Sequence, residues 1–408
     1  MKESMKRNLN LAALLWDEAY LWAIWLYDAL IKSNIGFEII RAKDLENLDK
    51  YKVLFVPGGW ARLKLSAITS KGVQLIKDFI KNGGIYFGLC GGAGLATKEG
   101  MGILNIKRKK DRVPSFSGPV KVFLEKHPLW EGIKNSVFYL WWPSEFLIND
   151  KNIKVLAKFG SPCFGSFSSD IPVYDFKNMW EELSSVYEIN LNPEKMKDTP
   201  LFVEANYGKG KVFLPLIHFD TPNDKNGLKV FKNLKSFFEL SDAGFAEKSL
   251  KSNQNQSLSI AKIMLNRIKD LIKFGERNFL WFKRNSFMYQ WRRGIRGFEY
   301  INLYYMIKRI NQELKGSPCS DKLIFEQLNE VLPELEVFLS EARKLLLKER
   351  IALQRGKITY NFSNHEEIQA LRHKLFGENK SYGGIYKDLL KKIDEILFEL
   401  LRNKLRVY

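Results

Sequence analysis

Short runs of apolar residues alternate with helical patterns through the first 240 residues of the chain. Four of these runs have the length and composition of buried strands: 11–16, 37–42, 53–56 and 85–89. Between them, segment 19–32 is predicted as a helix, and the apolar residues of segment 73–80 fall on one helical face. This strand–helix rhythm predicts an α/β domain with a mostly parallel sheet and helices on both of its faces.

From residue 120 to residue 217, strand-like runs dominate and the helical signal is weak. Five such runs stand at 120–124, 137–140, 153–157, 201–205 and 212–217. Their β-branched, apolar composition predicts further strands.

The pattern changes after residue 240. Residues 241–256 are polar and carry no periodicity, and beyond them apolar residues recur at alternating spacings of three and four. Two such series are typical of helix-bundle or coiled-coil seams: Leu328, Val331, Leu335, Phe338, Ala342 and Leu345, and then Tyr386, Leu389, Ile393, Ile396 and Leu400. We predict an α/β domain at 1–245, a linker at 246–256 and an all-α helical domain at 257–408, since one core rarely grows beyond about 250–300 residues.

Composition excludes several classes of protein. The three cysteines, Cys90, Cys163 and Cys319, are too few and too scattered for a disulfide framework. No CxxC pair or Cys/His cluster suggests a metal, and we expect neither a metal nor a cofactor. The N-terminal region has no unbroken apolar core for a signal peptide and no run of about 20 apolar residues for a membrane span, which predicts a cytoplasmic protein.

The net charge of +19 is concentrated in the C-terminal part of the chain. Residues 251–408 hold 30 Lys and Arg against 18 Asp and Glu, which gives +12. Such a surface could attract nucleic acid, an anionic membrane or an acidic protein, and a soluble basic bundle would show the same charge. Aromatic and cationic residues interleave over 279–296, which suits base stacking, a membrane interface or, as we favour, core aromatics beside snorkelling arginines.

The strongest local signal is the segment 85–96, in which a buried strand runs into Cys90, then small residues and a helix start. Small neighbours such as Gly91 and Gly92 suit a nucleophile elbow, because that turn strains the backbone and crowds its surroundings. A helix N-terminus beside the sulfur also favours the thiolate. A buried structural cysteine next to a glycine turn would give the same pattern, so the motif alone leaves both roles open.

A second motif follows the strand at 53–56. That strand ends in Pro-Gly-Gly, with Gly58 and Gly59 before Trp60. Such a turn exposes backbone N–H groups at the carboxyl edge of the sheet, where open α/β folds bind ligands. These groups could stabilise an oxyanion beside Cys90.

A third motif supplies a candidate base. The strand at 212–217 ends in His218, and the carboxylate of Asp220 can point the same way as the imidazole. With a cysteine nucleophile these two residues suggest a Cys-His-acid triad, in which Asp220 orients the base. His127, in an exposed-looking turn, is the weaker candidate.

Taken in order, the three motifs resemble the class I glutamine-amidotransferase superfamily. Within it they are most similar to the N-terminal domain of biotin–protein ligases and its stand-alone relatives. The resemblance covers roughly residues 9–240, with strand-Pro-Gly-Gly, then Gly-x-Cys-x-Gly about 30 residues later, then Gly-Lys-Gly-x-Val ending in His-x-acid.

The resemblance implies a fold and a set of roles. The fold is a flavodoxin-like sheet with a nucleophile elbow. Cys90 takes the role of nucleophile, His218 that of base and Asp220 that of acid, and the amides of Gly59 and Gly91 form the oxyanion hole. The remaining pocket candidates are Gly58, Trp60 and Gly92.

Several positions depart from the family's pattern. Gly94 stands where glutaminases usually carry Gln, Phe219 and Asp220 replace the usual Pro-Glu, and Gly91 replaces the His of related intracellular proteases. Neither glutamine hydrolysis nor proteolysis is therefore carried over. Biotin ligation lacks support too, because the Arg- and Gly-rich segment 292–297 lies in a region without predicted strands.

Two functions stay open at this point. The Cys90, His218 and Asp220 set favours a cysteine-dependent amidohydrolase or amidotransferase-like enzyme that acts on an unknown small molecule. The missing Gln favours a non-catalytic module that binds a ligand or partner and docks to a protein or anionic partner through the basic helical domain. Slow reaction of the Cys90 thiol would support the second function.

Overall fold

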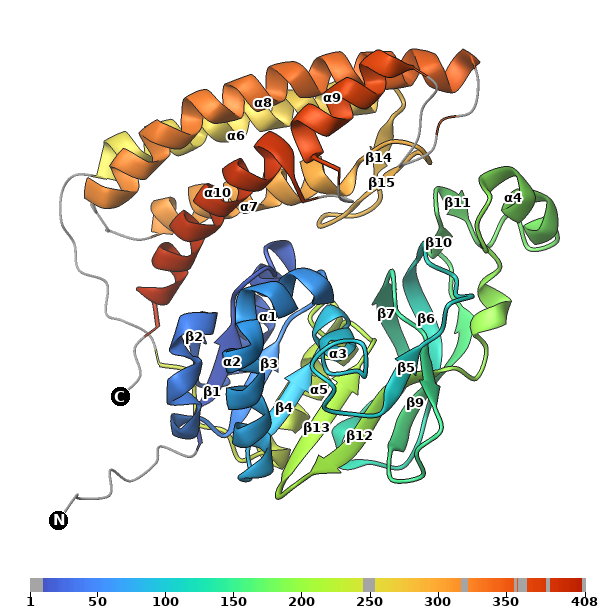
Figure 1. Cartoon of the computed structure of the whole chain (residues 1–408), viewed down its shortest axis with the longest axis vertical. Helices are drawn as coiled ribbons and strands as arrows, with labels where there is room; N and C mark the ends of the chain where they lie inside the picture. The colour runs from blue at the N-terminus through green and yellow to red at the C-terminus, as the bar shows by residue number, and fades with distance from the viewer. Residues whose placement is uncertain are drawn as a thin grey trace. The chain divides into compact units, whose positions relative to one another are not determined.

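The computed structural model describes residues 10–244, 254–316, 322–355, 358, 365–378 and 382–405. The chain divides into two compact units, an α/β unit assigned to Met1–Phe245 and Leu405–Tyr408 and a helical unit assigned to Ala246–Lys404 (Figure 1). Most of the predicted linker and Cys319 lie outside the described residues, and a helix already begins at Gln254. None of the helices in these stretches is both long and apolar enough to cross a bilayer.

Five parallel strands form the first half of the main sheet. In spatial order they are β2 (Phe37–Ile40), β1 (Ala12–Leu15), β3 (Val53–Val56), β4 (Ile85–Gly88) and β13 (Gly210–Pro215). The strands β1, β3 and β4 are buried along their whole length, as the continuous apolar runs of a parallel sheet should be. The predicted parallel sheet is thus present at the N-terminal end of the fold.

Helices cover both faces of these parallel strands. They are α1 (Leu21–Lys32), α2 (Ala61–Lys81), α3 (Gly91–Leu95) and α5 (Lys225–Phe237), joined by the 3₁₀ segment η1 (Ala42–Lys50). Figure 1 shows α2 in front of the strands and α5 behind them, and α1 packs against α5. Helix α2 ends at Lys81, shortly before Gly83 takes a φ of +112° that a residue with a side chain rarely adopts.

Beyond β13 the same sheet continues with antiparallel strands. β12 (Pro200–Tyr207) pairs with β13, and then follow β9 (Lys154–Pro162), β6 (Phe116–Leu124), β10 (Phe167–Ser168) and β11 (Ile171–Pro172), with β7 (Val137–Trp141) beside β6. The described residues give this sheet eleven strands. Outside it, β5 (Ile106–Arg108) pairs with β8 (Phe146–Ile148), and the shorter helices are η2 (Pro128–Trp130), α4 (Trp180–Tyr187) and η3 (Pro193–Met196).

The helical unit is built from five helices in its described residues. They are α6 (Gln254–Arg277), α7 (Phe298–Gly316), α8 (Lys322–Arg355), α9 (Glu366–Phe376) and α10 (Gly384–Arg402). Helix α6 packs on α7 and α8, and α10 packs on α7, α8 and α9. Every member of the two predicted seams in α8 and α10 is buried, so the three–four spacing did mark the core faces of these helices.

The prediction that this part is entirely helical is wrong at one place. A hairpin of β14 (Trp281–Lys283) and β15 (Tyr289–Trp291) precedes α7. Its side chains alternate, since Trp281 is buried whereas Phe282 is half exposed. The aromatic residues that interleave with cations here therefore include both core side chains and exposed ones.

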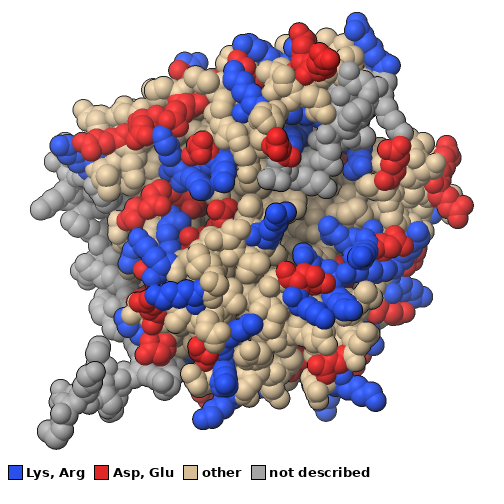
Figure 2. All heavy atoms as spheres, viewed as in Figure 1, with Lys and Arg blue, Asp and Glu red and all other residues tan. Residues whose placement is uncertain are grey.

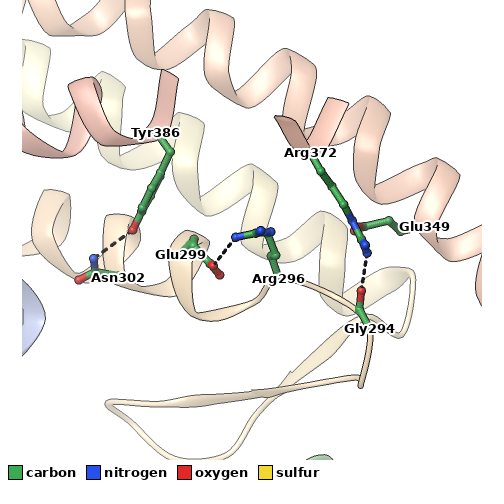
Figure 3. A network of polar contacts seen from close by, with 7 residues as sticks. All are labelled: Gly294, Arg296, Glu299, Asn302, Glu349, Arg372 and Tyr386. Carbon is green, nitrogen blue, oxygen red and sulfur yellow. Dashed lines mark hydrogen bonds and ion pairs between the residues drawn. The ribbon is translucent and has the colours of Figure 1, made fainter. Parts of the chain in front are cut away.

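A buried network of charged groups holds the interior of the helical unit together (Figure 3). Arg372 of α9 donates from Nε to Glu349 of α8 at 2.8 Å and from Nη2 to the carbonyl of Gly294 at 2.7 Å. Arg296 pairs with Glu299 at 3.3 Å. The Arg- and Gly-rich segment 292–297 is thus the turn between β15 and α7, in which Arg296 and the Gly294 carbonyl are engaged inside the unit and Arg292 is exposed.

Candidate functional site

Cys90 lies on a sharp turn between β4 and the short helix α3. Its backbone has φ +46° and ψ −96°, in a region that residues with side chains rarely adopt. The turn is fixed from both neighbouring strands, because Leu89 N–H donates to the carbonyl of Val56 and Cys90 N–H donates to that of Pro215. Cys90 itself is partly exposed.

The glycines after Cys90 are required by close backbone contacts. A Cβ on Gly91 would sit 1.8 Å from the carbonyl oxygen of Gly59, and one on Gly92 would sit 2.2 Å from that of Val56. Tyr86 stabilises the turn, because its hydroxyl donates to the Gly92 carbonyl at 2.7 Å. The elbow predicted from the sequence therefore has the crowded geometry expected of it.

The Pro-Gly-Gly turn lies directly against this elbow. Gly59 has a φ of +108°, and neither Gly59 nor Gly91 donates its N–H to a protein acceptor within the described residues. Gly58 packs on the imidazole of His218, since a Cβ there would lie 2.9 Å from Cε1. Trp60, 46 % exposed, stands at the start of α2.

His218 and Asp220 lie together just after β13. Asp220 Oδ1 is 2.9 Å from His218 Nδ1, and both side chains are almost completely buried. The other ring nitrogen, Nε2, makes no hydrogen bond of ordinary geometry within the described residues, and the Cys90 thiol donates to the carbonyl of Trp141 with an Sγ–O distance of 3.7 Å. Cys90 nevertheless acts on the ring, because its charge is among the causes that raise the pKa of His218.

Charge on these neighbours decides the protonation of His218. Burial lowers its pKa, but the carboxylate of Asp220 and then the negative charge of Cys90 outweigh burial and raise the pKa to about 10. At neutral pH the ring is thus an imidazolium beside the carboxylate of Asp220. Helix α3 has only five residues, so its dipole at Cys90 is weak.

Tryptophan side chains that the sequence did not single out enclose the imidazole. The ring centroids of Trp22 and Trp25 lie 4.8 Å and 6.5 Å from that of His218, and Trp22 also contacts Trp142 at 6.1 Å. Trp141 donates from its indole to Thr221 Oγ1 at 3.0 Å. The i, i+3 spacing of Trp22 and Trp25 in α1 and the Trp141-Trp142 pair at the end of β7 are visible in the sequence, but no local pattern links either pair to His218.

His127 is engaged elsewhere in the unit. Its Nδ1 accepts from Leu129 N–H at 3.2 Å, and its Nε2 lies 3.6 Å from Glu204. The hydrogen bond from His127 is the main reason that the pKa of Glu204 falls to about 2. No group of three or more His, Cys, Asp or Glu side chains within the described ranges is placed to hold a metal ion.

The comparisons with known proteins agree with the motifs at the elbow. Residues 38–101 match the biotin–protein ligase N-terminal family. This match confirms the predicted resemblance over a segment that contains the Pro-Gly-Gly turn and Cys90. No curated protein is similar to the chain.

Solved structures with a related fold are distant. PurLQS from Thermotoga maritima is 15% identical, with 56% of this chain and 99% of that one covered at a TM-score of 0.42. A GMP synthase component from Thermoplasma acidophilum is 14% identical to this chain. The comparison covers 56% of this chain and 94% of that one, and its TM-score is 0.37. A ThuA-like protein from Bacteroides uniformis is 12% identical. That comparison covers 58% of this chain and 93% of the other, with a TM-score of 0.34. At these scores the likenesses carry no argument about function.

Proposed function

We propose that the α/β unit is a cysteine-dependent amidohydrolase in which Cys90 is the nucleophile, His218 the proton carrier and Asp220 the group that orients His218. The observation that supports this most is the pairing of a buried imidazolium and carboxylate beside a partly exposed cysteine on a strained turn. A cysteine that served only as core filling would need neither the strained turn nor a charged neighbour.

The proposed reaction follows from the position of each group. The Cys90 thiolate attacks the amide carbonyl, a C–S bond forms, and the N–H groups of Gly59 and Gly91 stabilise the oxyanion. The imidazolium of His218 then gives its proton to the leaving amine as the C–N bond breaks, which leaves a thioester. His218 next takes a proton from water, the resulting hydroxide displaces the sulfur, and a carboxylic acid and the thiolate–imidazolium pair are formed again.

Gly94 restricts which substrates the site can hold. It lies in α3 with room around it, because a Cβ there would meet only Ala61 at 3.7 Å and Arg108 Nη1 at 4.0 Å. No side chain at this position is available to hold glutamine, so we expect glutamine to be a poor substrate. The absence of a side chain at Gly94 also supports the second candidate, a non-catalytic module that binds a ligand at the elbow and a partner through the basic helical unit.

Acylation by p-nitrophenyl acetate distinguishes the two candidates. We expect the full chain to release a rapid burst of p-nitrophenolate with one acetyl group on Cys90, located by mass spectrometry. His218→Ala should slow the burst by about 10²-fold, the lower end for loss of acid–base catalysis, and Asp220→Asn should slow it less.

Cys163→Ser is the matched control. Burial raises the pKa of Cys163, and its replacement should leave the burst unchanged. Acetylation that is equally fast at Cys90 and Cys163, or a burst that survives His218→Ala at full rate, would reject the enzyme and favour the binding module.

A further inference from the structure

One end of the Cys90 site is built by a loop that the motifs did not identify. Residues 109–115 connect β5 to β6, and several hydrogen bonds tie this loop to the segment after β7. Lys109 N–H donates to the carbonyl of Glu145 at 2.7 Å, Val113 N–H donates to its carboxylate at 2.8 Å, and Arg112 Nη1 donates to the carbonyl of Pro143 at 2.9 Å. Trp141, the last residue of β7 just before this segment, supplies the carbonyl that accepts from the Cys90 thiol.

Arg112 is thereby fixed within electrostatic reach of Cys90. Burial lowers the pKa of Arg112 and the neighbouring Arg108 adds to that lowering, whereas the negative charges of Cys90 and Glu145 oppose it. Glu145 does not neutralise Arg112 completely, because its carboxylate already binds Lys109 at 3.1 Å and Val113 N–H. In the described part of the chain Arg112 makes a single hydrogen bond, so most of its five donors stay available.

Arg108 approaches the elbow from the end of β5. Its Nη1 lies 4.0 Å from the point where a side chain on Gly94 would begin, so the guanidinium borders the space that glycine leaves open. Arg108 is exposed, and its backbone N–H donates to Glu99 at 3.4 Å. In the face that Figure 2 shows, Lys and Arg side chains gather on the α/β unit around β5 and β6.

We infer that this site takes an amide that carries a carboxylate, which the guanidinium of Arg112, with Arg108 beside it, holds next to the Cys90 thiol. This inference rests on the proposed function of Cys90. A guanidinium binds a carboxylate through two parallel N–H bonds, which would also align the amide carbonyl with the sulfur. Two guanidinium groups repel an ammonium group, so the substrate class is an amide acid without an amino group near its carboxylate, unlike glutamine.

Two alkylating agents of nearly equal size test this inference. Iodoacetate and iodoacetamide both react by attack of the thiolate on carbon with loss of iodide, but only iodoacetate carries a carboxylate. The probe ratio is the rate with iodoacetate divided by the rate with iodoacetamide, measured by mass spectrometry on the full chain. We expect this ratio to be roughly tenfold higher at Cys90 than at Cys163, which is the effect of one charge-assisted hydrogen bond.

The variants separate this inference from the proposed function. Arg112→Met should bring the probe ratio at Cys90 down to that at Cys163, and the exposed Arg108→Met should lower it in part. Lys110→Met, which removes an exposed cation from the same loop, should leave the ratio unchanged. Succinamate should protect Cys90 from iodoacetamide at a lower concentration than glutamine does.

The possible negative results distinguish failure of the carboxylate site from failure of the proposed function. An equal probe ratio at Cys90 and Cys163, or a ratio that survives both Arg112→Met and Arg108→Met, overturns the carboxylate site even if His218→Ala still slows iodoacetamide. Stronger protection by glutamine than by succinamate also overturns it. If His218→Ala leaves the iodoacetamide rate at Cys90 unchanged, the proposed function itself has failed.

Discussion

Gly91→Ala should destabilise the α/β unit by at least about 3 kcal/mol, the upper range for overpacking a buried contact. The added Cβ would lie 1.8 Å from the carbonyl oxygen of Gly59. That oxygen belongs to backbone with a φ of +108°, so it cannot rotate away as a flexible side chain would. Either the Pro-Gly-Gly turn or the elbow must move, and Cys90 would move with it.

Gly94→Ala is the matched control in the same helix. Its Cβ would meet only Ala61 and Arg108 at ordinary contact distances, and alanine is the better helix former. It should be neutral or stabilise the unit by up to about 1 kcal/mol. Hydrogen exchange of the β4 amides measures the stability of this unit separately from the helical one. A Gly91→Ala protein as protected in β4 as Gly94→Ala would contradict the contact between the two turns.

Arg372→Ala should destabilise the helical unit by about 3–5 kcal/mol, because it leaves the carboxylate of Glu349 buried without its partner. The effect should grow with pH. Burial raises the pKa of Glu349 to about 7 even with Arg372 present, so the folded unit favours the protonated acid. Stability from this group is complete below its ordinary pKa of 4.5 and is lost as pH rises through the raised value. The loss caused by Arg372→Ala should therefore be larger at pH 8 than at pH 5.

Two variants make this prediction specific. Arg267→Ala removes an exposed ion pair with Glu336 and should cost at most about 1 kcal/mol. Replacing both partners of the buried pair, as Arg372→Met with Glu349→Leu, should recover much of the lost stability. Urea unfolding, monitored through hydrogen exchange of the amides in α8 and α9, measures the free energy of unfolding of each variant. An equal loss for Arg372→Ala and Arg267→Ala would show that the network in Figure 3 contributes no more than a surface pair.

The sequence predicted the parts of the fold that local patterns determine. Strands β1, β3 and β4 are buried on both faces, so their continuous apolar runs identified them. The antiparallel extension beyond β13 was not specified, because short apolar runs mark β6 and β9 as strands and only contacts between distant segments set their direction. The hairpin β14–β15 was missed since its strands have three residues each and lie between long helical patterns.

The residues of the candidate site also fall into those that the sequence predicted and those that it did not. Cys90 and His218 follow buried strands at the carboxyl edge of the sheet, so their chain positions predicted that they would lie near each other. Trp22 reaches His218 from α1, some 200 residues away along the chain, and no local pattern connects the two. Arg112 lies in an irregular loop, and its place beside Cys90 depends on a hydrogen bond to the Pro143 carbonyl. Side chains supplied by loops and by distant helices are therefore what the sequence left out.

The titration of His218 in the full chain tests most directly whether Cys90 and His218 form one charged site. With the histidine rings labelled for NMR, His218 should titrate near pH 10 rather than near 6.5, and the stability that its raised pKa contributes should be complete below pH 6.5 and lost as pH rises through 10. Asp220→Asn should lower this pKa most, and Cys90→Ala should lower it by a smaller but measurable amount, since each removes a neighbouring negative charge. A His218 that titrates near 6.5, or whose pKa is the same with and without Cys90, would contradict the account.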